Sequence, residues 1–123
     1  DENLNNFDGI CMSYGLRNLE SVEDGIRKVF SLLKDGGRAG FLDFHHSSRN
    51  SPSNIFQKLY LRLIVVPISK IFRLTQEYSY IEKSIQNFPR KEELIRISKE
   101  VGFRKIQYRT IFFSQMGMLI LEK

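Results

Sequence analysis

Hydrophobic residues recur along this chain in blocks whose spacing changes from strand-like to helical and back. Residues 7–13 form a short apolar run, which is typical of a parallel strand buried in a sheet. Residues 22–33 place apolar side chains at helical spacing, with charged residues on the opposite side. Residues 38–44 form a second apolar run. A strand, a helix and a second strand in this order predict a βαβ unit with parallel, adjacent strands.

The ends of this first helix carry local signals. Ser21, with Asp24 three positions later, resembles a weak capping box. Gly36 and Gly37 are expected to stop the helix, because glycine readily adopts positive φ angles. The second strand is then expected to begin at Arg38.

The middle of the chain, residues 52–88, is expected to be a helical insertion. Apolar residues are dense over residues 55–72 and occupy more than one helical face, and Pro67 should break or kink the segment. This pattern favours a helix packed on the sheet. The alternative is a lid over a lipophilic substrate, with its Lys and Arg residues at a membrane surface. Residues 76–87 form a further helical candidate.

The last third of the chain predicts one more helix and two strands. Pro89 is well placed to start the helix, which should end at Gly102 followed by the hydrophobic Phe103. Residues 105–111 alternate as an edge or half-covered strand does, whereas residues 116–121 suit a strand buried on both faces. The short connection between these strands requires them to be antiparallel. The fold class is therefore α/β, an otherwise parallel sheet closed by an antiparallel hairpin.

Composition and charge narrow the class of protein. The 123 residues are 41% hydrophobic and 27% charged, which fits one soluble globular domain at most. The chain opens on Asp1 in a polar stretch, so we expect a truncation. The net charge of +5 is dispersed, which argues against nucleic acid and suits an enzyme that visits anionic membrane surfaces. No apolar tract reaches the roughly 20 residues that a spanning helix needs.

Cysteine and histidine usage argues against a metal centre. Cys11 is the single cysteine, which excludes an internal disulfide and suits a reducing compartment. Its neighbours Ile10 and Met12 predict that it is a buried small hydrophobe rather than a catalytic thiol. His45 and His46 are adjacent, with no carboxylate or cysteine at ligand spacing. We therefore expect solvated loop histidines and no metal.

Several motifs carry a resemblance to a known family. Residues 7–18 contain F-D-G-I followed by S-Y-G-L-R-N, and residues 32–44 contain L-L-K-D-G-G-R followed by L-D-F. Residues 78–89 contain Y-S-Y-I, S-I and F-P, and residues 93–103 begin with E-L and end with V-G-F. These segments resemble the signatures of the ubiquinone/menaquinone biosynthesis C-methyltransferases (UbiE/MenG). The likeness runs over nearly the whole chain.

The departures from the family pattern are informative. Asp35 replaces the usual proline before the glycine pair, and residues 115–123 look more like the cyanobacterial and plastid branch, which methylates demethylphylloquinone. The family's glycine-rich first loop and its acidic cofactor contacts would precede residue 1. We therefore expect residues 1–123 to be one partial domain, the carboxyl-terminal half of a class I methyltransferase (Rossmann-like) sheet, without the amino-terminal cofactor-binding half.

The resemblance implies C-methylation of a prenylated quinol of the demethylphylloquinol or demethylmenaquinol type, with S-adenosyl-L-methionine as cofactor. It further implies a cytoplasmic enzyme that associates peripherally with the membrane, and a homodimer is one expected assembly. The alternative is a non-enzymatic, truncated or degenerate domain. Such a domain would use its basic, apolar insertion to bind membranes or a partner.

The resemblance also assigns catalytic residues. Arg17 would stabilise the phenolate that forms during methylation, because its planar guanidinium is always charged. Asn18 would hold a phenol oxygen or a water in the proton path. The structural alternative is that Arg17 meets a surface carboxylate and Asn18 caps the following turn.

Other candidate residues would contact the cofactor or the substrate. Ser13 occupies the family's cofactor-contacting position at the end of the first strand; alternatively, its hydroxyl bonds the adjacent backbone. Tyr78 and Tyr80 would line the quinol pocket, although aromatic residues at this spacing are also typical of a core. Asp43 would contact the substrate or serve as a structural hydrogen-bond acceptor.

Overall fold

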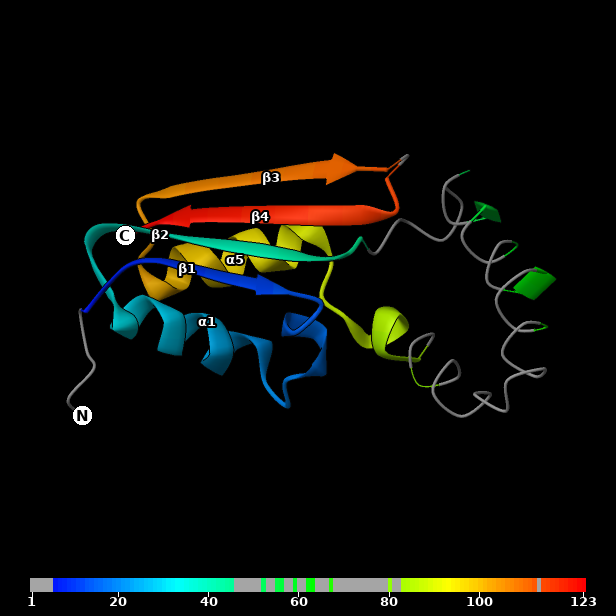
Figure 1. Cartoon of the computed structure of the whole chain (residues 1–123), viewed down its shortest axis with the longest axis horizontal. Coiled ribbons are helices and arrows are strands. Elements are labelled where there is room, and N and C mark those ends of the chain that lie inside the picture. Colours follow the sequence, from blue (N-terminus) through cyan, green and yellow to red (C-terminus); the bar gives the residue numbers. More distant parts are fainter. Residues whose placement is uncertain are drawn as a thin grey trace.

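The computed structural model describes residues 6–45, 83–112 and 114–123, together with the single positions 52, 55, 56, 59, 62, 63, 67 and 80. The elements in chain order are β1 (Phe7–Ser13), the 3-10 helix η1 (Leu16–Asn18), α1 (Val22–Leu32), β2 (Leu33–Phe44), α5 (Lys91–Val101), β3 (Lys105–Ile111) and β4 (Met116–Glu122). The strands form one sheet in the order β1-β2-β4-β3. Helices α1 and α5 contact each other and lie side by side along this sheet (Figure 1).

The strand directions agree with the sequence analysis. β1 is parallel to β2, with Ile10 opposite Ala39 and Met12 opposite Phe41. β4 is antiparallel to both of its neighbours, β2 and β3. The predicted βαβ unit and the predicted terminal hairpin are therefore confirmed. The carboxyl ends of β1 and β2 meet at one edge of the sheet, where the polar loop after β1 begins.

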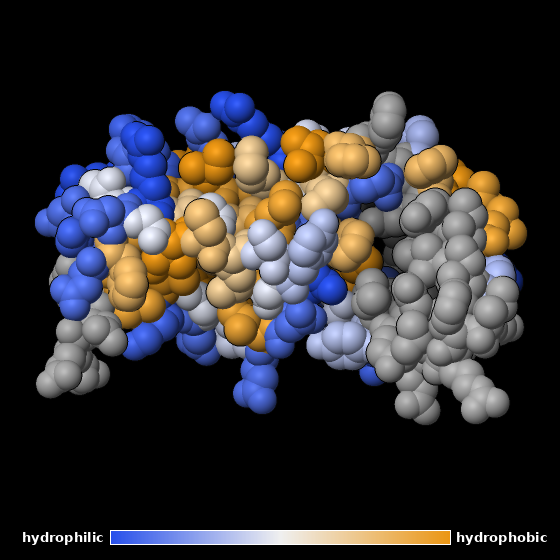
Figure 2. Space-filling model, in the orientation of Figure 1, coloured by the Kyte–Doolittle hydropathy of each residue, from blue (hydrophilic) through white to orange (hydrophobic). Residues whose placement is uncertain are grey.

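The hydrophobic core lies between the sheet and its two helices. It is built from fully buried side chains of strands and helices alike, including Ile26, Phe41, Leu94, Leu119 and Leu121. The opposite face of the sheet carries the half-buried residues Leu42, Phe44, Met116, Met118 and Ile120. Figure 2 shows hydrophobic residues gathered over the middle of the sheet. The prediction that β4 is buried on both faces is therefore wrong for this second face.

β1 is less buried than its apolar sequence predicts. Ile10 and Met12 point to the helix side and are half-buried, whereas Cys11 on the other face is exposed. The predictions of a buried first strand and a buried Cys11 are wrong. The physical reason is position: β1 is an edge strand, and β2 is its only partner among the described strands.

The carboxyl end of α1 is set by a distant residue rather than by the glycine pair. The helix ends at Leu32, and Leu33 already has the extended backbone of β2. The ammonium group of Lys123 donates hydrogen bonds to the carbonyls of Phe30 (2.9 Å) and Leu33 (2.8 Å). These bonds satisfy carbonyl groups that the helix leaves without an internal partner. The predicted stop at the glycines and the strand start at Arg38 are therefore wrong; the chain turns within β2 at Gly36, whose φ angle is +77°.

Two other predicted helix ends are confirmed. The Ser21 hydroxyl accepts a hydrogen bond from the backbone N–H of Asp24 at 3.1 Å, as an N-cap residue does. α5 ends at Gly102, whose φ angle is +116°. The backbone N–H of Phe103 then reaches the carbonyl of Ser98 at 3.2 Å, which is the bond of a Schellman motif.

Most predictions for the insertion lie outside the described residues. Residues 83–87 are helical, as expected for the end of the 76–87 segment. The hydrophobic residues that are described, Ile55, Phe56, Leu59 and Leu63, are exposed by 61, 58, 53 and 62%. These four side chains are therefore largely exposed, and the prediction of a helix packed on the sheet does not hold for them. Within the described part of the chain, no helix is both long and apolar enough to span a bilayer.

Candidate functional site

The polar loop after β1 turns sharply and delivers Arg17 and Asn18 to the carboxyl edge of the sheet. Tyr14 has a φ angle of +54°, and its backbone N–H makes the last bond to β2, reaching the carbonyl of Leu42 at 2.7 Å. A Cβ at Gly15 would lie 2.8 Å from the Met12 side chain, so glycine leaves that side chain its room beside the turn. The short helix η1 follows at once and positions both polar residues.

Arg17 forms a buried ion pair with Asp43 at the end of β2. Arg17 Nη1 and Asp43 Oδ1 are 2.9 Å apart, and the two side chains are only 8% and 4% exposed. The carboxylate also accepts hydrogen bonds from the backbone N–H groups of Arg17 (3.1 Å) and Phe44 (2.9 Å). These added donors compensate for the loss of hydration that a buried carboxylate suffers. Asp43 therefore has the structural role that the sequence left open, and the carboxylate that meets Arg17 is buried rather than on the surface.

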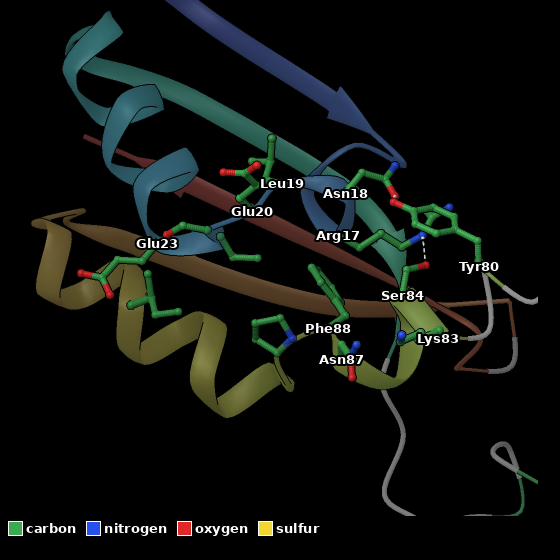
Figure 3. A pocket seen from close by; sticks show the side chains of 14 residues that line it. Arg17, Asn18, Leu19, Glu20, Glu23, Tyr80, Lys83, Ser84, Asn87 and Phe88 are labelled. Atoms are coloured by element: carbon green, nitrogen blue, oxygen red, sulfur yellow. Dashed lines mark hydrogen bonds between the residues drawn. The ribbon is translucent and has the colours of Figure 1, made fainter.

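The rest of the guanidinium is held on a second side. Arg17 Nε donates to the hydroxyl of Ser84 at 3.2 Å (Figure 3), and Nη1 also reaches the carbonyl of Tyr14 at 3.3 Å. The Phe44 ring lies 5.1 Å from the guanidinium carbon. Within the described part of the chain, Nη2 has no hydrogen-bond partner. The guanidinium thus keeps an oriented pair of N–H groups at Nη2 that no described residue uses.

A cavity of about 600 Å³ opens beside this guanidinium. It lies between η1, the start of α1, Tyr80 and residues 83–89, and its wall is both polar and apolar. The lining residues are Arg17, Asn18, Leu19, Glu20, Ser21, Val22, Glu23, Tyr80, Lys83, Ser84, Asn87, Phe88, Pro89 and Ile97. Figure 3 shows Arg17, Asn18, Tyr80 and Ser84 close together at one end.

Asn18 and Tyr80 complete that polar end. The Asn18 amide donates to the carbonyl of Tyr14 at 2.9 Å, and the Tyr80 hydroxyl donates to Asn18 Oδ1 at 3.2 Å. Tyr80 is 55% exposed, so it is not the core aromatic residue that its spacing also allowed. The structure thus brings Arg17, Asn18, Tyr80 and Asp43 together. Tyr78 lies outside the described residues.

The predicted cofactor contact, Ser13, lies apart from this cavity. Ser13 is the last residue of β1, it is exposed, and it stands opposite Leu42 in the sheet register. A nucleotide cofactor needs a glycine-rich turn that opens a helix after a strand, and an acidic residue for the ribose. The described ranges contain neither feature in that arrangement. These residues alone therefore do not fit the whole of S-adenosyl-L-methionine.

A second polar cluster lies at the same end of the sheet. His45 Nδ1 and the Tyr108 hydroxyl are 2.8 Å apart, and the hydroxyl lies over Gly117, where an added Cβ would be 1.9 Å away. Burial, with the nearby charges of Glu92 and Asp43, raises the pKa of Tyr108 to about 12. His45 lies in a loop, as predicted, but it is half-buried and bonded to Tyr108 rather than fully solvated. His46 lies outside the described residues. No group of three or more metal-ligating side chains occurs among the residues that the structure describes.

Sequence reasoning did not single out Ser84 or Tyr108. Ser84 lies within one of the quoted motifs, but nothing local indicates that its hydroxyl meets an arginine 67 positions away. Nothing in the sequence around Tyr108 distinguishes it from an ordinary residue of a strand.

The chain matches the ubiE/COQ5 methyltransferase family over residues 1–119. This chain belongs to that family. It is 39% identical to the 2-phytyl-1,4-naphtoquinone methyltransferase of Synechocystis sp. over 119 residues, which are 97% of this chain and 50% of the relative. It is 34% identical to the demethylmenaquinone methyltransferase of Chlamydia muridarum, over 91% of this chain and 49% of the relative. The chain thus spans about half the length of these curated relatives.

Solved structures of methyltransferases share the fold of this family member. A SAM-dependent methyltransferase from Thermotoga maritima matches with a TM-score of 0.59 and 16% identity, covering 98% of this chain and 58% of that one. The phosphoethanolamine N-methyltransferase 2 of Haemonchus contortus, in complex with S-adenosyl-L-methionine, matches with a TM-score of 0.63 and 12% identity, covering 98% of this chain and 34% of that one. The predicted methyltransferase-type α/β fold is confirmed.

Proposed function

We propose that this chain forms the substrate side of an S-adenosyl-L-methionine-dependent enzyme that methylates a ring carbon of a prenylated naphthoquinol. The family and the named relatives, which act on phytylnaphthoquinone and demethylmenaquinone, support this class of substrate. The observation that carries the proposal is the buried Arg17 guanidinium, which lines the cavity with the N–H groups of Nη2 unused by any described residue.

The chemistry of ring methylation explains why such a group is needed. A ring carbon of the quinol becomes nucleophilic when a neighbouring hydroxyl loses its proton, so the site must stabilise a phenolate oxygen. The negative charge of Asp43 offsets the positive charge of Arg17. The ion pair therefore offers the ligand fixed N–H donors rather than a net positive charge. Pre-oriented donors of this kind contribute about 3–4 kcal/mol to transition-state stabilisation in other enzymes.

The remainder of the cavity suits a ring that is polar at its edge and apolar on its faces. Asn18 and Tyr80 lie next to Arg17, where they would hold a phenol oxygen or a water. Val22 and Phe88 contribute apolar wall farther along. A volume of about 600 Å³ also lies in the usual range of small-molecule sites, about 300–1,000 Å³.

We propose in addition that the protein is cytoplasmic and docks peripherally on membranes. The exposed Ile55, Phe56, Leu59 and Leu63 would enter the lipid interface, and the net charge of +5 favours anionic lipids. A flotation assay with anionic and with neutral phospholipid vesicles measures the fraction of the protein that binds to each. Preferential binding to anionic vesicles that weakens with salt supports the proposal. If the same amount of protein is found in the floating fraction with and without vesicles, the proposal is contradicted. Lipid binding without methylation by the complete gene product would favour the non-enzymatic alternative.

The enzymatic proposal is tested with Arg17→Lys in the complete gene product. Lysine keeps the charge but loses the planar fork, so it cannot hold Asp43, Ser84 and a phenolate together. We expect kcat for methylation of a demethylated naphthoquinol to fall by about 10²–10³-fold, as on loss of an oxyanion donor. Arg96→Lys is the matched control, because Arg96 lies on the exposed side of α5 between Glu93 and Glu100. Unchanged turnover in a folded Arg17→Lys variant would remove the role proposed for Arg17.

A further inference from the structure

We propose that Ser84 is a positioning residue that sets the plane of the Arg17 guanidinium, so that Nη2 faces the ligand in the cavity. This inference rests on the proposed function, because it concerns the same arginine. Ser84 acts through Arg17 and needs no contact of its own with the reacting atoms.

The geometry of the contacts gives Ser84 this task. Asp43 and the carbonyl of Tyr14 both bind Nη1, at 2.9 and 3.3 Å. Because both contacts are made at Nη1, rotation about the side-chain bonds that lead to Nε can still tilt the guanidinium plane. The bond from Nε to Ser84 Oγ, at 3.2 Å, is made at a second nitrogen, and because both N–H bonds lie in the guanidinium plane, acceptors at Nε and Nη1 together fix the orientation of that plane. With Ser84 in place, the direction of the Nη2 N–H groups is therefore determined.

Burial makes this anchor hard to replace. Ser84 is only 9% exposed and the Arg17 side chain is 8% exposed, so little of either side chain contacts solvent. A serine hydroxyl accepts from Nε while still donating its own proton elsewhere. Alanine at this position would leave the buried Nε–H without its acceptor, which costs more than the bond itself contributes.

The position of Ser84 in the chain links the arginine to the cavity wall. Ser84 lies in the helical residues 83–87, which also contribute Lys83 and Asn87 to the lining, and Tyr80 precedes them. One short stretch thus supplies both the wall opposite η1 and the anchor for Arg17. The orientation of the guanidinium consequently depends on this stretch being in place against η1.

The test combines Ser84→Ala with Arg17→Lys in a double-mutant cycle on the complete gene product. The probe is a water-soluble naphthol that is acidic enough to be ionised at neutral pH, and its dissociation constant is measured by fluorescence. We expect Ser84→Ala to weaken binding about tenfold when Arg17 is present, and to have little further effect in the Arg17→Lys background. Ser84→Thr should restore binding, because threonine keeps the hydroxyl.

Ser98→Ala is the matched control. Ser98 is also a buried serine, but its hydroxyl donates to the carbonyl of Leu94 within α5. Ser98→Ala should leave the affinity for the naphthol unchanged. An equal loss of affinity on Ser84→Ala in both Arg17 backgrounds would show that Ser84 acts independently of Arg17, and would overturn the proposal.

An NMR measurement separates this inference from the proposed function. The Nε–H signal of Arg17, recorded without any ligand, should move in Ser84→Ala and stay in place in Ser98→Ala. If it moves while Arg17→Lys retains full methylation activity, the positioning holds and the assigned role of Arg17 fails. A signal that does not move in Ser84→Ala overturns the positioning itself.

Discussion

The two faces of the sheet are built from the same strands but differ in what covers them. On the helix side, Phe41, Leu119 and Leu121 are buried under α1 and α5. On the other side, their immediate neighbours Met118 and Ile120 are equally hydrophobic but only half-buried. Alternation along a strand thus separates the faces, and the packed helices decide which face becomes a core.

The covered face also carries the polar site. Asp43 follows Ala39 and Phe41 on that face of β2, and it is buried where the strand meets η1. The row of buried side chains on this face of β2 therefore ends in a carboxylate that forms an ion pair with Arg17. The lesson is that one face supplies both the core and the low-dielectric surroundings in which hydrogen bonds to Arg17 are strong.

The largest effect is expected from Asp43→Ala. This change leaves the Arg17 guanidinium buried without its anionic partner, and loss of one member of a buried pair costs about 3–5 kcal/mol of unfolding free energy. Urea denaturation measures the change. Glu23→Ala breaks the exposed pair with Arg27 and should cost about 1 kcal/mol or less. Equal losses for the two variants would show that the covered face does not isolate its ion pair from water.

Truncation of neighbouring residues on β4 compares the faces directly. Leu121→Ala should lower the unfolding free energy by about 2–5 kcal/mol, because it opens a cavity in the core. Ile120→Ala, one residue away on the half-buried face, should cost clearly less. Denaturation midpoints of the two variants give the difference. The comparison sharpens if the complete gene product is also measured, because a larger cost for Ile120→Ala there would indicate that a further segment covers this face.

Glycine replacement makes the same comparison on a smaller scale. Gly117 lies on the covered face, where a Cβ would be 1.9 Å from the Tyr108 hydroxyl. Gly117→Ala should therefore displace Tyr108 and cost about 1–3 kcal/mol. Gly40 lies on the other face, where the nearest atom to a Cβ is the Cys11 sulfur at 4.0 Å. Gly40→Ala should leave the melting temperature nearly unchanged, and a large loss there would contradict the difference between the faces.

The smallest effect is expected from alkaline pH. The pKa of Tyr108 in the folded protein is raised from 10.0 to about 12, mainly by burial. Between these values the folded state holds the phenol proton while the unfolded state has lost it, so stability falls as pH rises through that window. Tyr108→Phe should make this fall shallower, as measured by urea denaturation at pH 9.5 and above, in steps of about half a unit. An unchanged pH dependence in Tyr108→Phe would show that the covered face does not shield this hydroxyl.

The sequence by itself determined the order of the elements and several of their ends. Strand and helix periodicity gave the βαβ unit and the terminal hairpin, and local capping chemistry placed Ser21 and Gly102 correctly. The motifs identified the family, and they drew attention to Arg17 and Asn18. These features depend on residues a few positions apart, where spacing along the chain is also proximity in space.

Only the tertiary structure decided burial and partnership. The edge position of β1 exposed Cys11, and Lys123 capped a helix that ends 91 positions earlier, at Leu32. The bonds of Arg17 to Asp43 and Ser84 join residues 26 and 67 positions apart. Such contacts depend on sheet register and on how helices pack. A single sequence records no pattern for them, because any acceptor brought to that place by the fold would satisfy the same donor.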